Sequence, residues 1–360
     1  MIPVTKTFFP PIDIYHKYLD QIWKNEWLTN NGALFKELSF KLKEKLAVNN
    51  IIPMTNGTLP LQIALNAFGK EGEIITTPFS YVATTAAIVW EKCTPVFVDI
   101  NADYLTIDET KIEAAITAKT TCILATHVYG NPCHVTVIDK IAKKYGLKVI
   151  YDAAHCFGVN HNGQSIFNFG DVSTCSFHAT KLFHTGEGGA IFCQDQSTLH
   201  EMKYRNSFGH NGQEEYFGLG INAKMSELQA AMGLSVLPYI DQIIANRKRV
   251  CDYYTQNLNF TNLSRLKLRA NTKWNYSYYP IIFNSEQELL NIKNILSASC
   301  IMTRRYFYPS LTKLPYVESE KSTPVAEDIA TRVLCLPVYP SLNESSCENI
   351  VKLINSHNNL

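Results

Sequence analysis

Short β-rich stretches alternate with helical stretches along the middle of the chain, starting near residue 70. The β-rich stretches are bounded by turn residues, and the helical ones repeat apolar residues every three or four positions. Expected strands are residues 73–77, 95–99, 122–127 and 148–152, and expected helices are residues 81–91, 108–116 and 135–145. Because strands that alternate with helices are joined by crossovers, this order predicts a mostly parallel sheet with helices on both faces.

The pattern changes after residue 170. Two more β-rich runs, 172–177 and 189–193, extend the same sheet, and a long helical region from 226 to about 257, broken at Pro238, leads out of it. The rest, with a β-rich run at 276–283 and a helix at 286–297, predicts a smaller α+β unit. We therefore expect an α/β protein with a large domain over residues 1–240, whose N-terminal segment can pack on a small domain over residues 241–360.

The composition is that of a globular protein. The chain has 360 residues, of which 46% are hydrophobic and 18% charged, so it can bury a sizeable core. Its net charge is +1, and no run of Lys or Arg stands out that could follow a phosphate backbone. Nucleic acid is therefore not an expected partner.

No segment has the character of a membrane anchor. Charged residues from Lys6 to Asp20 interrupt the first 25 residues, which argues against a secretory signal. The uncharged stretch 74–90 is broken by Pro78 and Ser80 and is shorter than a membrane span. We expect a soluble protein without a membrane partner.

The ten cysteines are scattered along the chain, and none forms a C-x-x-C pair. A chain of this length needs no disulfide staples, so we interpret them as reduced thiols in a cytoplasmic protein. No Cys/His cluster has the spacing of zinc ligands, and no metal site is expected.

Candidate chemistry begins with Asn56-Gly57-Thr58, which precedes an expected helix over residues 59–67. A Gly-Thr pair at a helix start offers free backbone N–H groups and a hydroxyl, which suit a phosphate. The same residues also suit an ordinary helix N-cap, and the segment alone does not decide between the two.

Polar residues also follow the ends of two expected strands. Asp152 closes one strand, and Ser176 and Lys181 follow another. Ligands of open α/β sheets bind outside the carboxyl ends of the strands, so these residues can converge on one crevice. Taken singly, Asp152 could be a surface carboxylate and Lys181 a solvated lysine. However, the small and apolar residues 175–180 and the glycine turn 186–189 could desolvate the Lys181 amine and make it nucleophilic.

These segments together resemble the DegT/StrS sugar aminotransferases. That family shows S-G-T before a helix, P-x-x-[TS]-[FYW]-x-A-T, D-x-A-[QH] and S-F-x-x-x-K-x-x-x-x-G-E-G-G. The chain shows, in the same order, Asn56-Gly57-Thr58, Pro78 to Thr84 with one residue fewer after the proline, Asp152-Ala153-Ala154-His155 and Ser176 to Gly189. The resemblance runs from residues 27–32 to residues 336–340, and implies an aspartate-aminotransferase-like fold (fold type I) with pyridoxal 5′-phosphate as cofactor.

The resemblance also implies roles for single residues. Lys181 stands where the family has the lysine that forms a Schiff base with the cofactor and carries the proton between the substrate carbon and the cofactor. Asp152 would pair with the pyridine nitrogen and keep it protonated, since the protonated ring is the electron sink. Tyr81 would stack on the ring face. His155 falls where many relatives have Gln near the cofactor's 3-oxygen, although a lone histidine can equally be a core residue with its hydrogen bonds satisfied.

The cofactor phosphate would be bound by Gly57, Thr58 and Ser176. Relatives complete this cup with an asparagine from the neighbouring subunit in a G-x-N-x-[RK]-M-S-E element, which here spans residues 220–227 and places the asparagine at Asn222. The resemblance therefore implies a homodimer with shared active sites. In its commonest form this element has Tyr-Arg where this chain has Ala223-Lys224. The replacement puts in doubt any contact with a substrate anion that the arginine makes in relatives.

The implied reaction transfers an amino group from L-glutamate, which leaves as 2-oxoglutarate, to a nucleotide-linked keto sugar. Residues 222–227, 152–155 and 305–311 are most similar to enzymes that convert dTDP-4-dehydro-6-deoxy-D-glucose to dTDP-4-amino-4,6-dideoxy-D-glucose for O-antigen and other polysaccharides. Amination of a 3-keto sugar and a non-catalytic sensor or scaffold of the same fold stay open as alternatives. Related sugar dehydratases have a histidine where this chain has Lys181. The aromatic residues 306–308 could contact the sugar or simply pack.

Overall fold

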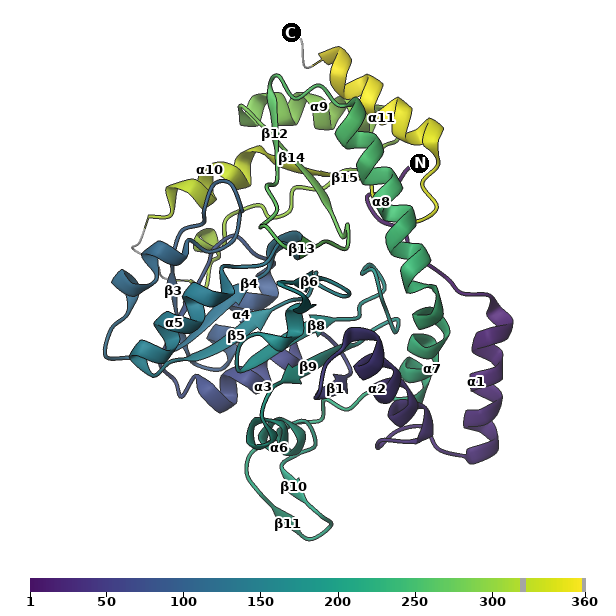
Figure 1. The fold of residues 1–360 in the computed structure, drawn as a ribbon, viewed down its shortest axis with the longest axis vertical. Helices are drawn as coiled ribbons and strands as arrows, with labels where there is room; N and C mark the ends of the chain where they lie inside the picture. Colours follow the sequence, from purple (N-terminus) through teal and green to yellow (C-terminus); the bar gives the residue numbers. More distant parts are fainter. Residues whose placement is uncertain (318–321, 358–360) are drawn as a thin grey trace.

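The computed structural model describes residues 1–317 and 322–357. Its largest sheet has seven strands (Figure 1). Their spatial order is β1 (Ile51–Met54), β9 (Gly189–Cys193), β8 (Val172–Ser176), β5 (Lys148–Asp152), β4 (Thr120–Thr126), β2 (Glu73–Thr76) and β3 (Thr94–Phe97). The run from β8 to β3 is parallel, whereas β9 is antiparallel to both of its neighbours. The strand ends after β1, β2, β4, β5 and β8 therefore lie along one edge, and the expected mostly parallel sheet is confirmed.

Alternate residues of the parallel strands face opposite layers of helices. On one face, Ile74, Leu124 and Ile150 pack with α3 (Leu59–Phe68), α4 (Val82–Trp90) and α6 (Gln196–Arg205). On the other face, Ile75 and Ile123 pack with α5 (Val135–Tyr145). Side chains of a strand alternate between its two faces, so an unbroken apolar run is what a strand covered on both sides requires.

The segment 108–116, expected to be a helix, instead forms two 3₁₀ turns, η1 (Glu109–Lys111) and η2 (Glu113–Ala115). The Asp108 carboxylate accepts hydrogen bonds from both the backbone N–H and the hydroxyl of Thr110. These local bonds compete with an α-helical pattern, and short 3₁₀ turns commonly serve as connectors. The expectation of a helix there was wrong.

The expected helical region after residue 226 is confirmed as α7 (Glu227–Val236), a 3₁₀ turn η5 (Leu237–Tyr239) that contains Pro238, and α8 (Ile240–Asn257). Ser226 starts α7 with a capping box, in which its hydroxyl and the Gln229 side chain each bond the other residue's backbone N–H. By length and composition, residues 227–257 could span a membrane, but half of the most apolar window is buried inside the molecule. α7 packs against α1 (Ile12–Asn25) and α2 (Ala33–Leu46), so we interpret the stretch as a core helix.

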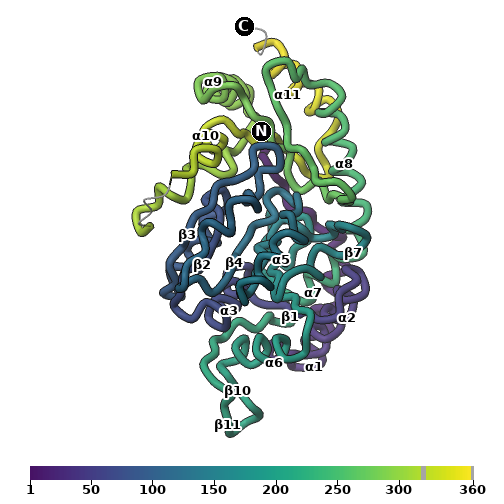
Figure 2. Tube along the Cα trace, turned by 60° about the vertical axis from the view of Figure 1, so that its left-hand side comes forward, coloured from purple at the N-terminus to yellow at the C-terminus, as the bar shows by residue number. Residues whose placement is uncertain are grey.

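A second hydrophobic cluster lies beyond the carboxyl edge of the large sheet (Figures 1 and 2). It is built on the antiparallel strands β12 (Leu263–Arg265), β14 (Tyr279–Phe283) and β15 (Val333–Leu336). The helices α9 (Glu286–Ala298), α10 (Pro324–Arg332) and α11 (Glu344–His357) accompany them. Ile2 forms a bridge with Ile301 in this part of the molecule. The division at residue 240 stays a prediction.

Shorter elements complete the chain. The strands β6 (Asn160–His161), β7 (Gln164–Ser165) and β13 (Thr272–Lys273) form a small sheet. The hairpin of β10 (His210–Asn211) and β11 (Glu215–Tyr216) projects from the body beyond α6, at the end away from the second cluster (Figure 2). The remaining 3₁₀ turns are η3 (Val128–Gly130), η4 (Ile166–Asn168) and η6 (Leu311–Lys313).

Candidate active site

A cavity of about 280 Å³ opens where the carboxyl edge of the large sheet meets the second cluster. Seven of the eight residues expected at the site line it, namely Gly57, Thr58, Tyr81, Asp152, His155, Ser176 and Lys181. Four further residues, Tyr278, Arg304, Tyr306 and Phe307, come from the segments just before β14 and after α9 and close it from the other side. The cavity therefore has two walls, which we call the strand wall and the opposite wall.

Asp152 lies at the centre of the strand wall and is only 5% exposed. Its carboxylate accepts hydrogen bonds from the Thr84 hydroxyl at 2.7 Å and the Ala154 N–H at 3.1 Å. Burial raises the pKa of Asp152, while these two hydrogen bonds and the charge of Lys181 act in the opposite direction. No cation among the described residues forms an ion pair with Asp152, so its charge is free to face a cationic group in the cavity.

A chain of hydroxyl groups supports this carboxylate. Ser80 lies 2.7 Å from the Thr84 hydroxyl and 3.0 Å from that of Thr126. A hydroxyl has one proton, and Thr84 gives its proton to Asp152, so Ser80 donates to Thr84 and Thr126 donates to Ser80. All three hydroxyl-bearing residues are buried, and the chain fixes the carboxylate in one orientation.

His155 is a buried neutral histidine. The Tyr129 N–H donates to His155 Nδ1 at 3.1 Å, so that nitrogen carries no proton and the neutral ring has its proton on Nε2. Burial, together with the positive charge of Lys181, lowers the pKa of His155 well below its ordinary value. The His155 backbone carbonyl also accepts hydrogen bonds from Asn275 and Ser277, which ties the strand wall to the segment that leads to Tyr278.

The Lys181 amine donates a hydrogen bond across the cavity. Lys181 belongs to the loop after β8, and its Nζ lies 3.2 Å from the Tyr278 hydroxyl of the opposite wall. The Tyr278 ring in turn lies 4.7 Å from the His155 ring. Amine, phenol and imidazole thus meet at one point between the two walls.

Gly57, Thr58 and Ser176, the residues expected to bind the phosphate, line the cavity together. Gly57 approaches Ser176 so closely that a Cβ atom on residue 57 would lie 2.7 Å from the Ser176 Cβ, which only glycine avoids. The Thr58 N–H donates to the Asn56 side chain at 2.9 Å and is therefore already engaged. Within the described residues, the Gly57 N–H and the Thr58 hydroxyl have no hydrogen-bond partner and remain available to an anion.

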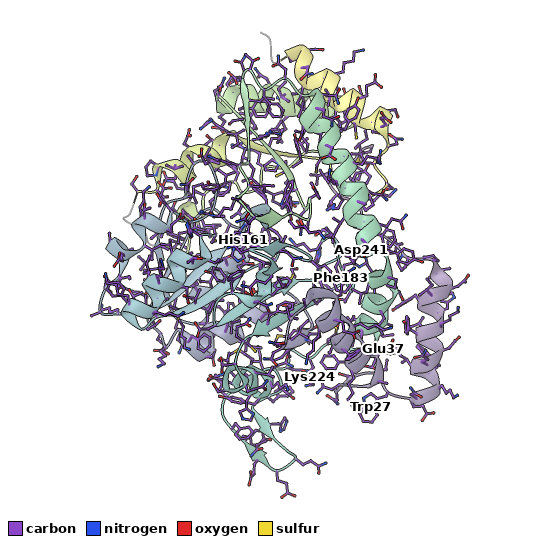
Figure 3. All side chains as sticks on the ribbon, in the orientation of Figure 1. Trp27, Glu37, His161, Phe183, Lys224 and Asp241 are labelled. Atoms are coloured by element: carbon purple, nitrogen blue, oxygen red, sulfur yellow. The ribbon has the colours of Figure 1, made fainter. Side chains whose placement is uncertain are left out.

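Tyr81 and Asn222 are both exposed, but only Tyr81 lines the cavity. The Tyr81 side chain is 51% exposed at the start of α4 and forms part of the strand wall. Asn222 is exposed and lies outside the cavity, where its side-chain oxygen accepts a hydrogen bond from Lys224 Nζ at 2.7 Å. Lys224 is labelled beside α6 in Figure 3. The structure therefore brings seven of the eight expected residues together and leaves Asn222 apart.

Sequence reasoning missed several residues of the cavity. Ser80 and Thr84 belong to the quoted segment 78–84, so their hydroxyl groups could have been assigned to Asp152 from that signal. Tyr278 and Arg304 carried no signal, because neither stands in a motif. Of the aromatic residues 306–308, Tyr306 and Phe307 line the cavity, whereas the Tyr308 ring packs under the Arg305 guanidinium.

Pyridoxal phosphate, the cofactor that the resemblance implies, fits these residues. Its protonated ring nitrogen needs a buried carboxylate without another cation, which Asp152 provides. Its phosphate needs N–H and hydroxyl donors at a helix start, which Gly57 and Thr58 provide at α3. Its aldehyde needs a primary amine, and Lys181 Nζ lies in the same cavity.

Comparison with known proteins gives concordant matches. The sequence profile of the DegT/DnrJ/EryC1/StrS aminotransferase family matches residues 14–355. The dTDP-4-amino-4,6-dideoxy-D-glucose transaminase of Escherichia coli is 42% identical over 368 residues, which cover 98% of each chain. The GDP-perosamine synthase of Escherichia coli O157:H7 is 32% identical over 346 residues, which cover 94% of each chain. The crystal structure of DesI in the presence of its TDP-sugar product matches with a TM-score of 0.94 at 28% identity, covering 99% of this chain and 93% of that chain.

Proposed function

The chain belongs to the DegT/DnrJ/EryC1/StrS aminotransferase family, and we propose that it transfers an amino group from L-glutamate to a nucleotide-linked keto sugar. It is a pyridoxal-phosphate-dependent sugar aminotransferase with the expected fold type I architecture. The observation that carries the proposal is the cavity itself, in which a lysine amine, a buried carboxylate and a neutral histidine lie between two walls.

Each residue of the strand wall has a distinct part in this proposal. Pyridoxal phosphate supplies an electron sink that lets an amino group pass from one substrate to the next. Lys181 Nζ would take the proton from the substrate carbon and deliver it to C4′ of the bound cofactor, as a general base and then a general acid. Asp152 would keep the proton on the ring nitrogen by its negative charge, and His155 Nε2 would donate a hydrogen bond to an oxygen of the cofactor.

The remaining residues bind and orient. Gly57, Thr58 and Ser176 bind the phosphate, and the exposed ring of Tyr81 stacks on the cofactor. Asn222 from a second copy of the chain completes the phosphate cup, which makes the active unit a homodimer. Its exposure and its position outside the lining of its own chain's cavity support this assignment. Because both half-reactions use one site, the kinetics should be ping-pong.

The substrate we favour is dTDP-4-dehydro-6-deoxy-D-glucose, which would give dTDP-4-amino-4,6-dideoxy-D-glucose for O-antigen or another polysaccharide. The support is the 42% identity to a transaminase named for that product. We also place the enzyme in the cytoplasm. All ten cysteines are free, and nine of them are buried, as expected for a reducing compartment.

A panel of dTDP-, GDP- and UDP-linked keto sugars tests the substrate. We expect amination at C4 of the dTDP-linked 4-keto-6-deoxyglucose, identified by mass spectrometry and NMR of the product. Amination at C3 would redirect the assignment to a 3-keto sugar. If glutamate converts the cofactor but no sugar in the panel reacts, the sugar assignment is wrong. If glutamate itself fails to react with the cofactor-loaded protein, the aminotransferase proposal fails.

A further inference from the structure

Arg304 enters the cavity from the opposite wall with an unpaired guanidinium. Its side chain is exposed, and the contact it makes is with the face of the Tyr306 ring, 5.0 Å from the ring centroid. Among the described residues it has no acidic partner and no hydrogen-bond acceptor. The next residue behaves differently, because Arg305 donates to the Glu286 carboxylate at 2.6 Å and to the Thr331 carbonyl at 2.9 Å. Arg305 is thus bound within the fold, and Arg304 is not.

The backbone of Arg304 is fixed although its side chain is free. Its N–H and carbonyl both pair with Cys335 of β15, at 3.3 and 2.8 Å. Three residues further on, Phe307 is buried, and its ring stacks parallel to the His155 ring with centroids 5.8 Å apart. The backbone at Arg304 is therefore fixed on the opposite wall by its pairing with Cys335, and the nearby Phe307 contacts His155 of the strand wall.

Neither carboxylate that lines the cavity pairs with the Arg304 guanidinium among the described residues. The Asp152 carboxylate accepts hydrogen bonds from Thr84 and Ala154, and the Glu187 carboxylate faces His178 at 3.6 Å. Neither forms an ion pair with Arg304 in the part of the chain that the structure describes. The cup proposed for the cofactor phosphate lies on the strand wall. The planar fork of an arginine binds two oxygens of a carboxylate or phosphate at once, so an unpaired one in a substrate cavity points to an anionic substrate group.

We propose that Arg304 binds the anionic oxygens of the substrates, either a carboxylate of the amino donor or the diphosphate of the sugar nucleotide. This inference rests on the proposed function, because it takes the cavity as the place where both substrates bind. It assigns a binding role to a residue on the opposite wall, at a position that no motif marks. Arg304 would select substrates by charge while the strand wall carries out the chemistry.

Equilibrium binding separates this inference from turnover. Cofactor-loaded protein is titrated with 2-oxoglutarate in one arm and with dTDP in the other by calorimetry, using wild type, Arg304→Gln and Arg304→Lys. Loss of a charge-assisted hydrogen bond should weaken at least one of the two ligands about tenfold in Arg304→Gln, and Arg304→Lys should fall between the two. The arm that weakens identifies the source of the anion. The titrations measure binding and need no turnover. A protein that binds both ligands but does not transaminate would contradict the proposed function and not the role of Arg304.

Arg265→Gln is the matched control. Arg265 is also an exposed arginine whose guanidinium rests on an aromatic ring, 5.5 Å from the Phe260 centroid, but it lies outside this cavity. We expect its variant to bind both ligands as wild type does. Unchanged affinity for both ligands in Arg304→Gln, or equal weakening in Arg265→Gln, would overturn the inference.

Steady-state kinetics provide a second readout. A residue that binds ground state and transition state alike raises KM and leaves kcat unchanged, so Arg304→Gln should raise KM about tenfold with little effect on kcat. The visible spectrum of the bound cofactor should not change. A loss in kcat at constant KM would assign Arg304 to the chemistry instead and would contradict the inference.

Discussion

The two walls of the cavity differ in how their polar groups are held. On the strand wall, Asp152 is buried, hydrogen-bonded twice and supported by a chain of hydroxyl groups. On the opposite wall, Arg304 is exposed and has no polar partner among the described residues. A group that stays in the site through every cycle is best bound by preorganised donors and charges, whereas groups that come and go need partners left free. The difference indicates that the strand wall holds the cofactor and the opposite wall meets the substrates.

Among substitutions that leave Lys181 in place, the largest effect should come from Asp152→Asn. The amide keeps the shape of the side chain but removes the charge that faces the cofactor, so the rate of the glutamate half-reaction should fall about 10² to 10³-fold. Stopped-flow absorbance of the cofactor measures this rate. Asp139→Asn, on the exposed surface of α5, serves as the control and should leave the rate unchanged. A rate within threefold of wild type, about 0.6 kcal/mol, would remove Asp152 from the proposed role.

A smaller effect is expected from Thr84→Val, which removes the hydroxyl that donates to Asp152. That hydrogen bond lowers the pKa of Asp152, so its loss should raise this pKa further and move the acidic limb of the kcat profile to higher pH. The rate at neutral pH should fall about tenfold, and Thr84→Ser should restore it.

Thr85→Val is a close control for this substitution. Thr85 is equally buried on the same helix, but its hydroxyl has no hydrogen-bond partner among the described residues. Replacing it should leave both the rate and the pH profile unchanged. If the two valine variants behave alike, the hydroxyl chain has no part in tuning Asp152.

On the opposite wall, Tyr278→Phe removes the hydroxyl that accepts a hydrogen bond from Lys181. We expect the glutamate half-reaction to slow about fivefold, because the amine loses one orienting hydrogen bond. Single-turnover absorbance measures the change, and Tyr308→Phe is the control, since the Tyr308 ring packs under Arg305 outside the cavity. A loss in rate as large as that of Asp152→Asn would contradict the assignment of the chemistry to the strand wall alone.

The smallest effect concerns stability in acid. Burial lowers the pKa of His127 to about 3 and that of His155 well below 6.5. Below pH 6.5 these two histidines bind protons in the unfolded chain but stay neutral in the folded chain. The free energy of unfolding should therefore fall as the pH drops from 6.5 toward 3. Each such histidine should contribute about 1.4 kcal/mol between pH 7.5 and 5.5.

Denaturant unfolding at those two pH values measures this loss. The variant His127→Asn keeps an acceptor for the Cys133 N–H, which bonds His127 Nδ1 at 2.9 Å, and removes the titrating ring. Its stability should depend less on pH than that of wild type. An equal pH dependence in the two proteins would show that His127 titrates freely in the folded state.

The strand wall could be predicted from the sequence because local patterns place it. The apolar runs that end at Asp152 and Ser176 form neighbouring strands, and parallel strands bring their carboxyl ends to one edge. The same reasoning failed at residues 108–116, where the Asp108 and Thr110 side chains bond locally and replace the expected helix with 3₁₀ turns.

The opposite wall could not be predicted in this way. Tyr278 reaches Lys181 across 97 positions of sequence, through the packing of a second cluster on the edge of the sheet. Arg304 stands beside β15 through a backbone bridge to Cys335, and no periodicity or motif places it there. Asn222 marks a different limit, since its proposed role depends on a second copy of the chain.

The reaction of the cofactor-loaded protein with L-glutamate alone tests the central claim most directly. We predict that the visible absorbance band disappears, that one 2-oxoglutarate forms per bound cofactor, and that borohydride before glutamate attaches the cofactor to the peptide containing Lys181. Lys181→Ala should show neither the bleaching nor the attachment. A band that persists in wild type with saturating glutamate, or a cofactor trapped on another lysine, would contradict the account.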